Sequence, residues 1–293
     1  MSDRVCRGIF PAHGLRAVLV RVGDTARMAR VLHGLAPTAA RLFAEALAAG
    51  ALLGALQKDG GRVNLQVACD GPVGGLLVDA DPEGNVRGYV KRPSVNFPGD
   101  PTRGARAALG GEGFLSVLRD RDGQNYRSSV ALEAMELAGD LRRWFEASEQ
   151  VGTALDIAVL PRSGDPLGDA VGLLVQRLPD GDAPALEVAR SRLAAGALAA
   201  AAGRGGGAQE ILAEVLGEGF DLLADQEIAY RCGCSPERAR VAVSSLGADG
   251  VDDLLAEHGR AQITCEFCRQ RYVLGPEDLR EISRLLRSGP GAS

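Results

Sequence analysis

The sequence predicts an α+β protein in three parts: an N-terminal antiparallel-sheet domain with helices, a helical connector and a small C-terminal domain built around cysteines. Three observations predict it. Apolar and polar residues alternate in Arg62–Cys69, and turn residues separate this segment from two further apolar segments up to Val90, as in antiparallel strands. From Pro184 the chain is alanine-rich, which favours helices. Four of six cysteines follow Arg231. The expected parts are 1–179, 180–230 and 231–293.

A long helix is expected at Thr38–Gln57. Its only charged residues are Arg41 and Glu45, four residues apart, so they can pair along one face. The rest of the segment is apolar nearly all round. A helix of this kind is typically buried in the core.

In the first domain, strands are expected before and after a helix near Glu136–Ser148 along the sequence. In Arg62–Cys69, Val63, Leu65 and Val67 share one face, which predicts a half-buried strand. With the next two segments it forms an antiparallel meander. Trp144 on the helix is expected in the core. The other expected strands are Val18–Val20, Leu76–Val78, Val86–Val90, Tyr126–Leu132, Ala154–Leu160 and Val171–Leu178.

The connector combines a helical stretch from Pro184 to Ala202 with a second amphipathic piece at Ile211–Leu216. Between them, the glycines of Gly203–Gly207 interrupt any helix. No Lys-Ser or Lys-Thr follows these glycines, so they do not form a phosphate loop. We expect a connector of modest intrinsic stability.

Composition excludes several partners. The chain has 293 residues, 46% of them hydrophobic, and a net charge of -5, which gives no electrostatic reason to expect nucleic acid or an anionic membrane. The most apolar run, Ala46–Leu56, is about half the roughly 20 residues that a membrane span requires. Met1–Arg7 is charged and lacks a signal-peptide core. We expect a cytoplasmic protein.

The C-terminal cysteines form a C-x-C pair, Cys232 and Cys234, and a C-x-x-C pair, Cys265 and Cys268. Two short-spaced pairs on separate turns can present four sulfurs to one Zn²⁺ in a tetrahedron. Such clustering is typical of metal or redox chemistry in a reducing compartment. The sequence therefore predicts one zinc ion with four thiolate ligands. The distant Cys6 and Cys69 are expected to be small buried hydrophobes.

The neighbours of these cysteines predict how they are held. Ser235 can cap a helix with Pro236 at its first position, so Cys234 lies at a helix N-terminus, which favours thiolate. A second short helix is expected at Val251–His258. Strand segments at 263–264 and 272–274 flank the second pair, which predicts a hairpin turn. Four arginines flank the ligands and can favour the anionic sulfurs: Arg231, Arg238, Arg269 and Arg271.

Zinc binding and disulfide formation exclude each other. With Zn–S bonds of about 2.3 Å, neighbouring sulfurs are held roughly 3.8 Å apart, whereas a disulfide needs about 2.05 Å. Structural zinc supplies an apparent stabilisation of about 10 to 16 kcal/mol at neutral pH, while a segment of roughly 60 residues has a core worth a few kcal/mol. Loss of zinc is therefore expected to unfold the C-terminal domain.

The cysteine motifs also carry a resemblance. The run Arg-Cys-Gly-Cys-Ser-Pro-Glu-Arg at 231–238, followed by Thr-Cys-Glu-Phe-Cys at 264–268 and by Tyr272, closely resembles the C-terminal zinc motif of the redox-activated 33-kilodalton heat-shock chaperone family. The resemblance covers nearly the whole chain. Further matches are Asp70-Gly71-Pro72, Gly88-Tyr89-Val90, Ser148-Glu149-Gln150, Gln176 and Leu178-Pro179.

The resemblance implies a function that spacing alone does not. Members of this family are ATP-independent holdases, inactive when reduced and zinc-bound. Under oxidants they form disulfides, lose zinc, unfold the C-terminal domain and connector, and bind unfolding client proteins, often as homodimers. On this chain, the resemblance implies disulfides Cys232–Cys234 and Cys265–Cys268, with the client surface on the N-terminal domain and connector.

Two other functions and one simpler site compete with this interpretation. A zinc ribbon that binds nucleic acid is disfavoured, because residues 231–293 contain nine Arg and nine Asp or Glu. A thiol oxidoreductase using Cys265 and Cys268 would have its C-x-x-C at a helix start, not between strands. The zinc site can also be purely structural, without switching. His13, His33 and His258 are expected outside the ligand shell, and we expect no catalytic activity.

Overall fold

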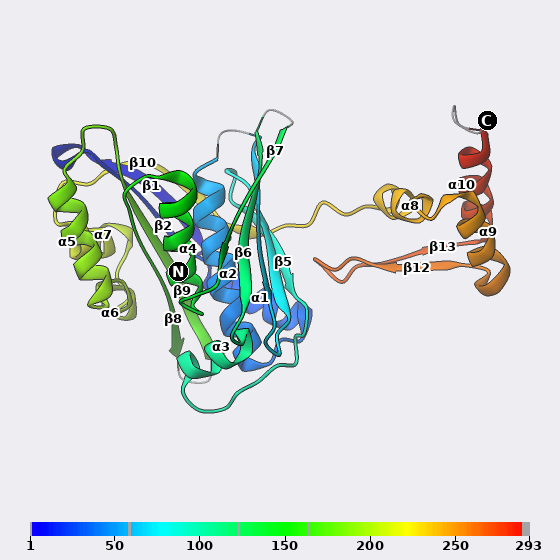
Figure 1. The fold of residues 1–293 in the computed structure, drawn as a ribbon, viewed down its shortest axis with the longest axis horizontal. Helices are drawn as coiled ribbons and strands as arrows, with labels where there is room; N and C mark the ends of the chain where they lie inside the picture. The colour runs from blue at the N-terminus through cyan, green and yellow to red at the C-terminus, as the bar shows by residue number, and fades with distance from the viewer. Residues whose placement is uncertain (1, 58–59, 122–123, 163–164, 289–293) are drawn as a thin grey trace. The chain divides into compact units, whose positions relative to one another are not determined.

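The structure is a computed structural model that describes residues 2–57, 60–121, 124–162 and 165–288 (Figure 1). The chain divides into two compact units, Met1–Arg231 and Cys232–Ser293. Both units combine antiparallel strands with helices, so the predicted α+β class is confirmed.

The first sheet of unit 1 has the strand order β10-β1-β2-β9-β8, with antiparallel neighbours throughout. The sequence predicted the apolar centres of β2, β8 and β9, but it gave no signal for β1, in which two arginines and a glycine interrupt the pattern, or for the acidic β10. The strand bounds are β1 (Arg4–Phe10), β2 (Leu15–Arg21), β8 (Thr153–Arg162), β9 (Asp165–Arg177) and β10 (Asp221–Glu227).

The second sheet has the order β11-β5-β4-β3-β6-β7. Its centre is the predicted antiparallel meander of β3, β4 and β5, and the side chains of Val63, Leu65 and Val67 are buried as expected. β6 and β11 were not predicted. The strand bounds are β3 (Arg62–Cys69), β4 (Gly75–Ala80), β5 (Asn85–Val90), β6 (Gly113–Arg121), β7 (Gln124–Ala131) and β11 (Ala229–Tyr230).

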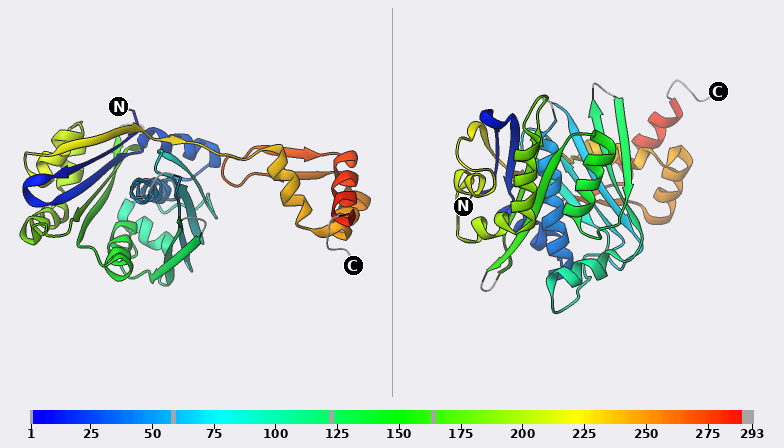
Figure 2. Two further views of the ribbon diagram at one scale, coloured as in Figure 1. Left: turned by 90° about the horizontal axis from the view of Figure 1, so that it is seen from above. Right: turned by 60° about the vertical axis from the view of Figure 1, so that its left-hand side comes forward.

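Helix α2 (Pro37–Ala55) is the predicted buried helix, and it packs against strands of both sheets. It is the blue helix seen nearly end-on between the sheets in the left view of Figure 2. Its 19 residues are long and apolar enough to cross a membrane by length and composition, but 89% of its apolar window is buried inside the protein. It is therefore the central core helix. Its two charges form the expected ion pair, Arg41 Nε to Glu45 Oε1 at 3.1 Å.

Shorter helices complete the core around α2. Trp144 and Phe145 are buried there as predicted, and the Trp144 indole N–H donates to Ser128 Oγ at 2.9 Å. The predicted helix at Glu136–Ser148 is α4 followed by a π-helical turn. The bounds are α1 (Gly23–His33), α3 (Pro101–Leu109), α4 (Leu137–Trp144), and the turns η1 (Pro11–His13) and η2 (Phe145–Glu149).

Residues 180–230, expected as a separate connector, lie in the same compact unit as residues 1–179. The helix predicted from Pro184 to Ala202 is two helices, α5 (Ala183–Ala194) and α6 (Ala197–Gly203), because Gly196 between them has a left-handed φ of 84°. With α7 (Ala208–Leu216), they cover the face of the first sheet opposite α2 and bury Leu186, Leu193, Leu198, Ile211, Leu212 and Val215. The apolar faces of these helices explain why the segment is packed.

Unit 2 is small. Its apolar core consists of Val243, Val251, Ala261, Leu274, Leu279 and Ile282. The sequence did not predict its last helix, α10, which supplies two of these residues. The element bounds are α8 (Pro236–Ser244), α9 (Gly247–His258), β12 (Ala261–Thr264), β13 (Arg271–Leu274) and α10 (Pro276–Ser288), with β12 and β13 paired antiparallel.

Candidate metal centre

The four C-terminal cysteines converge in unit 2. Each of them offers its Sγ atom, and these four atoms all lie within 4.8 Å of one another. Cys232 Sγ is 3.7 Å from Cys265 Sγ, and Cys234 Sγ is 3.2 Å from Cys268 Sγ. The edge of a zinc–thiolate tetrahedron is about 3.8 Å, so the donor set fits one tetrahedral ion. Among the residues described, this is the only such cluster of metal-binding side chains.

The first pair is positioned by the start of a helix. The Ser235 hydroxyl accepts a hydrogen bond from the Arg238 backbone N–H at 3.3 Å, and Pro236 is the first residue of α8, as predicted. Cys234 directly precedes this cap, so the start of α8 fixes the position of the first pair in the chain.

The second pair lies on the turn between β12 and β13, also as predicted. The Cys265 N–H donates to the Gln270 carbonyl at 2.9 Å, and the Arg269 N–H donates to the Cys265 carbonyl at 2.8 Å. Arg269 has a left-handed φ of 57°, which turns the chain back toward β13. The turn thereby places Cys265 and Cys268 on the same side of the hairpin.

Tyr272, which the sequence placed on the strand after the second pair and within the family motif, contacts the site directly. Its hydroxyl donates to Cys234 Sγ at 3.0 Å, and this contact raises the pKa of the phenol to about 12. A tyrosine four residues after the C-x-x-C, on the returning strand, was the available signal. A donated hydrogen bond of this kind stabilises a thiolate.

Two of the four thiols, Cys265 and Cys268, have raised pKa values. Burial, together with the neighbouring thiols, raises the pKa of Cys268 to about 12, and burial also raises the pKa of Cys265. Four sulfurs this close cannot all be anionic unless a cation compensates them. Binding of a metal must therefore displace protons, so affinity falls as pH falls.

One of the four flanking arginines, Arg269, and the nearby Arg240 form ion pairs with carboxylates. Arg269 Nη1 is 2.8 Å from Glu266 Oε2, and Arg240 bridges Asp278 and Glu281 at 2.5 and 2.6 Å. These ion pairs balance charge on the surface of unit 2. The role of Arg269 in keeping the sulfurs anionic stays a prediction.

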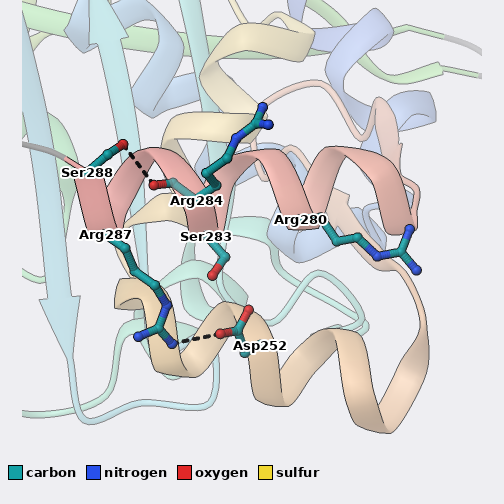
Figure 3. A pocket seen from close by; sticks show the side chains of 6 residues that line it. All are labelled: Asp252, Arg280, Ser283, Arg284, Arg287 and Ser288. Atoms are coloured by element: carbon teal, nitrogen blue, oxygen red, sulfur yellow. Dashed lines mark hydrogen bonds and ion pairs between the residues drawn. The ribbon is translucent and has the colours of Figure 1, made fainter.

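A concave region of unit 2 lies between α9 and α10 (Figure 3). Arg287 pairs with Asp252 at 2.7 Å and with Asp249 at 2.9 Å, whereas Arg280 and Arg284 point away from Asp252. Its lining contains no cysteine. The ion pairs of Arg287 join α10 to α9, and this concave region is separate from the thiol cluster.

The remaining candidate residues lie elsewhere. Cys6 is buried in unit 1 and its thiol donates to Asp225 Oδ1 at 3.4 Å, while Cys69 is half-buried against the core. His13 contacts Asp182 and His33 contacts the Tyr230 hydroxyl. His258 is exposed at the end of α9. None of these five side chains belongs to the four-sulfur cluster.

Together, the two units define a class: an α+β protein that carries a small four-thiol domain at its C-terminal end. Comparisons with known proteins agree. A sequence model of one family, described as Hsp33 protein, matches residues 3–275. The 33 kDa chaperonin of Geobacter sulfurreducens is 36% identical over 265 residues, covering 89% of this chain and 87% of the relative. That of Synechococcus elongatus is 35% identical over 294 residues, covering 96% and 97%.

The structural comparison gives the same answer. The crystal structure of the 33 kDa chaperonin from Thermotoga maritima matches with a TM-score of 0.87 and 27% sequence identity, over 97% of this chain and 99% of that chain. The chain belongs to the Hsp33 family, as its motifs predicted. This is a family of chaperones and not of enzymes.

Proposed function

We propose that the chain is a redox-regulated, ATP-independent holdase whose switch is the four-cysteine cluster. The observation that carries the proposal is the convergence of four sulfurs within 4.8 Å in a unit with only a small apolar core. Such a unit depends on its metal for folding, because structural zinc supplies about 10 to 16 kcal/mol and a core of this size a few.

In the reduced state, Cys232, Cys234, Cys265 and Cys268 would hold one Zn²⁺, which would supply a fixed tetrahedral crosslink between the α8 start and the hairpin turn. Four cysteine thiolates are the donor set that structural zinc prefers. The Tyr272 hydroxyl supports the charge on Cys234.

Oxidation would remove these ligands. Two thiolates give two electrons to one peroxide, forming one S–S bond and two hydroxide ions, so two peroxides convert the four thiolates into two disulfides. We assign the bonds as Cys232–Cys234 and Cys265–Cys268. Disulfide sulfurs no longer carry the charge that binds the ion, and the two short loops stabilise the unit little in return. Unit 2 then unfolds.

The activated protein would bind unfolding client proteins and prevent their aggregation. Residues 1–179 and the connector residues 180–230, both within unit 1, would provide the client surface, and the active species would be a homodimer in the cytoplasm. The net charge of -5 supports a protein partner and not nucleic acid or an anionic membrane.

The experiment treats reduced, zinc-loaded protein with peroxide at mildly elevated temperature, while a colorimetric chelator follows released zinc and light scattering follows a thermally unfolding client. We expect zinc release and suppression of aggregation to rise together. Release of zinc without suppression would refute the chaperone function, and equal suppression before oxidation would refute the switch.

Two cysteine variants serve as a matched pair. Cys234→Ser removes a ligand, so we expect a reduced protein that retains little zinc and already suppresses aggregation. Cys69→Ser changes a thiol outside the cluster, and its zinc content and switching should equal those of the unaltered protein. Retention of nucleic acid at moderate salt would support a zinc ribbon instead.

A further inference from the structure

One segment of unit 1 occupies an edge of each sheet. Phe220–Tyr230, here called the strap, contains β10 and β11. β10 pairs antiparallel with β1 at the edge of the first sheet, and β11 pairs parallel with β5 at the edge of the second. Only Arg231 separates the strap from Cys232, the first ligand of the metal centre.

The backbone of the strap lies directly against two glycines, Gly8 and Gly84. A Cβ atom on Gly8 of β1 would lie 2.2 Å from the Asp221 carbonyl oxygen and 2.3 Å from the Phe220 ring. A Cβ atom on Gly84 would lie 2.2 Å from the Glu227 carbonyl oxygen. The backbone of the strap therefore approaches both sheets more closely than any residue with a side chain would allow.

Polar and apolar contacts both hold the strap, and its Ile228 side chain is buried in the core. Asp225 Oδ1 lies 2.5 Å from Arg4 Nε, and the Tyr230 hydroxyl donates to the Gly88 carbonyl at 2.7 Å. In contrast, the Leu222 and Leu223 side chains are 45% and 66% exposed. Releasing the strap therefore uncovers the core surface against which Ile228, Phe220 and Tyr230 pack, and it leaves the backbone groups on one side of β1 and β5 in need of partners.

The other two sheet edges do not change with the state of the strap. β7 and β8 are edge strands in the structure as it stands, and β7 carries mostly exposed polar residues, including Asn125, Arg127 and Ser129. Polar, charged edges resist pairing with other chains. Among the described strands, the edges under the strap are the ones that its release would create.

We propose that the strap is an internal occupant of the β1 and β5 edges, and that its release lets an extended segment of an unfolding protein pair with these edges. This inference rests on the proposed function and assigns its client site. The recognised chemistry is an extended backbone with free N–H and C=O groups, which an unfolded chain offers and a folded one does not. Unfolding of unit 2 frees the C-terminal end of the strap.

Hydrogen exchange measured by mass spectrometry locates the contact. The probe is reduced, carboxymethylated α-lactalbumin, which stays unfolded in buffer. On oxidation, we expect the amides of β1, β5 and the strap to lose protection. On addition of the probe, β1 and β5 should regain protection while the strap stays exposed. Protection that returns only elsewhere, or a strap that stays protected after oxidation, would overturn the inference.

Substitution of one of these glycines tests the release of the strap without oxidation. Gly8→Ala should displace the strap, so the reduced, zinc-loaded variant should expose strap amides and suppress aggregation at least about fivefold better than the unaltered protein. Gly111→Ala is the control, because a Cβ there meets nothing within 4 Å. A displaced strap with no gain in suppression would contradict the inference. Fluorescence of Trp144 reports whether Gly8→Ala still folds.

A covalent lock provides a second test that does not depend on Gly8. Cys6 and Asp225 are register partners, with the thiol 3.4 Å from the carboxylate. Directly paired residues have Cα atoms about 4.5 to 5.5 Å apart, within the range of a disulfide. Asp225→Cys should therefore bond to Cys6 under peroxide and hold the strap on β1, and the double variant Cys6→Ser, Asp225→Cys is the unlocked control.

We expect the locked protein to release zinc normally but to lose most of its suppression, by about fivefold or more, and its probe-dependent protection of β1. Full suppression of client aggregation by the locked protein would contradict the strap inference without affecting the proposed holdase function. If the unaltered oxidised protein fails to suppress aggregation, the holdase function itself fails.

Discussion

Glu45 is a largely buried carboxylate on the central helix of unit 1. Burial raises its pKa to about 7, and nearby Glu136 and Asp156 add to the rise while Arg41 opposes it. Glu45, Arg142 and Asp156 line one small cavity, and burial also raises the pKa of Asp156. Burial and the two neighbouring carboxyl groups make the charged form of Glu45 costly in the folded protein.

The sign of the resulting pH dependence follows from proton binding. The folded pKa of about 7 exceeds the usual value of 4.5, so the folded state binds more protons between these pH values. Stability is therefore greatest below pH 4.5 as far as this group is concerned, and it falls as pH rises to 7. We expect Glu45→Gln to remove this slope, giving a gain of about 2 to 3 kcal/mol at pH 8 relative to pH 4.5.

Urea unfolding of reduced protein, followed by the fluorescence of the single tryptophan, Trp144, measures this slope. Glu187→Gln is the matched control, because Glu187 is an exposed carboxylate that also pairs with an arginine, at 2.8 Å. Parallel pH profiles of stability for Glu45→Gln and the unaltered protein would show that ionisation of Glu45 does not cause this pH dependence.

At the scale of elements, α10 completes the core of unit 2. Leu279 is fully buried on its inner face, whereas Leu285 on the same helix is 58% exposed. Removing a buried leucine side chain typically costs about 2 to 5 kcal/mol, through lost transfer free energy and the cavity left behind. In a core of six buried residues, this is a large fraction of the apolar stabilisation.

We therefore expect Leu279→Ala to release zinc to peroxide at least about tenfold faster than the unaltered protein, because unit 2 opens more often and exposes its thiolates. The rate is measured with a colorimetric chelator at fixed peroxide. Leu285→Ala should release zinc at the unaltered rate. Equal rates for the two variants would show that the core does not limit access to the sulfurs.

At the scale of the whole molecule, the chain has two compact units with very different means of stabilisation. Unit 1 has large apolar clusters on both faces of its first sheet, while unit 2 combines a small cluster with four thiols. Domains that differ in this way unfold in separate transitions. Metal removal is expected to affect one of them selectively.

We expect a strong chelator to unfold residues 232–293 in reduced protein and to leave the main unfolding transition of unit 1, followed by Trp144 fluorescence, in place. Hydrogen exchange of unit 2 amides measures the first effect, and added zinc with reductant should restore protection. Amides of unit 2 that stay protected in chelator would contradict the dependence of its fold on metal.

Much of the architecture was predictable because local patterns and burial agreed. The alternation in β3, the apolar surface of α2 and the Ser235-Pro236 helix start each gave the correct element. β1 and β10 were missed because their apolar patterns are interrupted. α10, in contrast, carries a helical signal in the sequence, because Pro276 starts it, acidic residues occupy its first turn and Leu279 and Ile282 share one face. The packing of α5–α7 on the first sheet was also missed, because alanine-rich segments do not indicate what they pack against.

The sequence by itself determined the candidate donor set, since the spacing of two thiol pairs and the motif around them identify four sulfurs and a family. Only the tertiary structure decided that these sulfurs converge, that Tyr272 contacts one of them, and that the strap covers two sheet edges. The physical reason is range: spacing and propensity act over a few residues, whereas these contacts join segments that only the folded chain brings together.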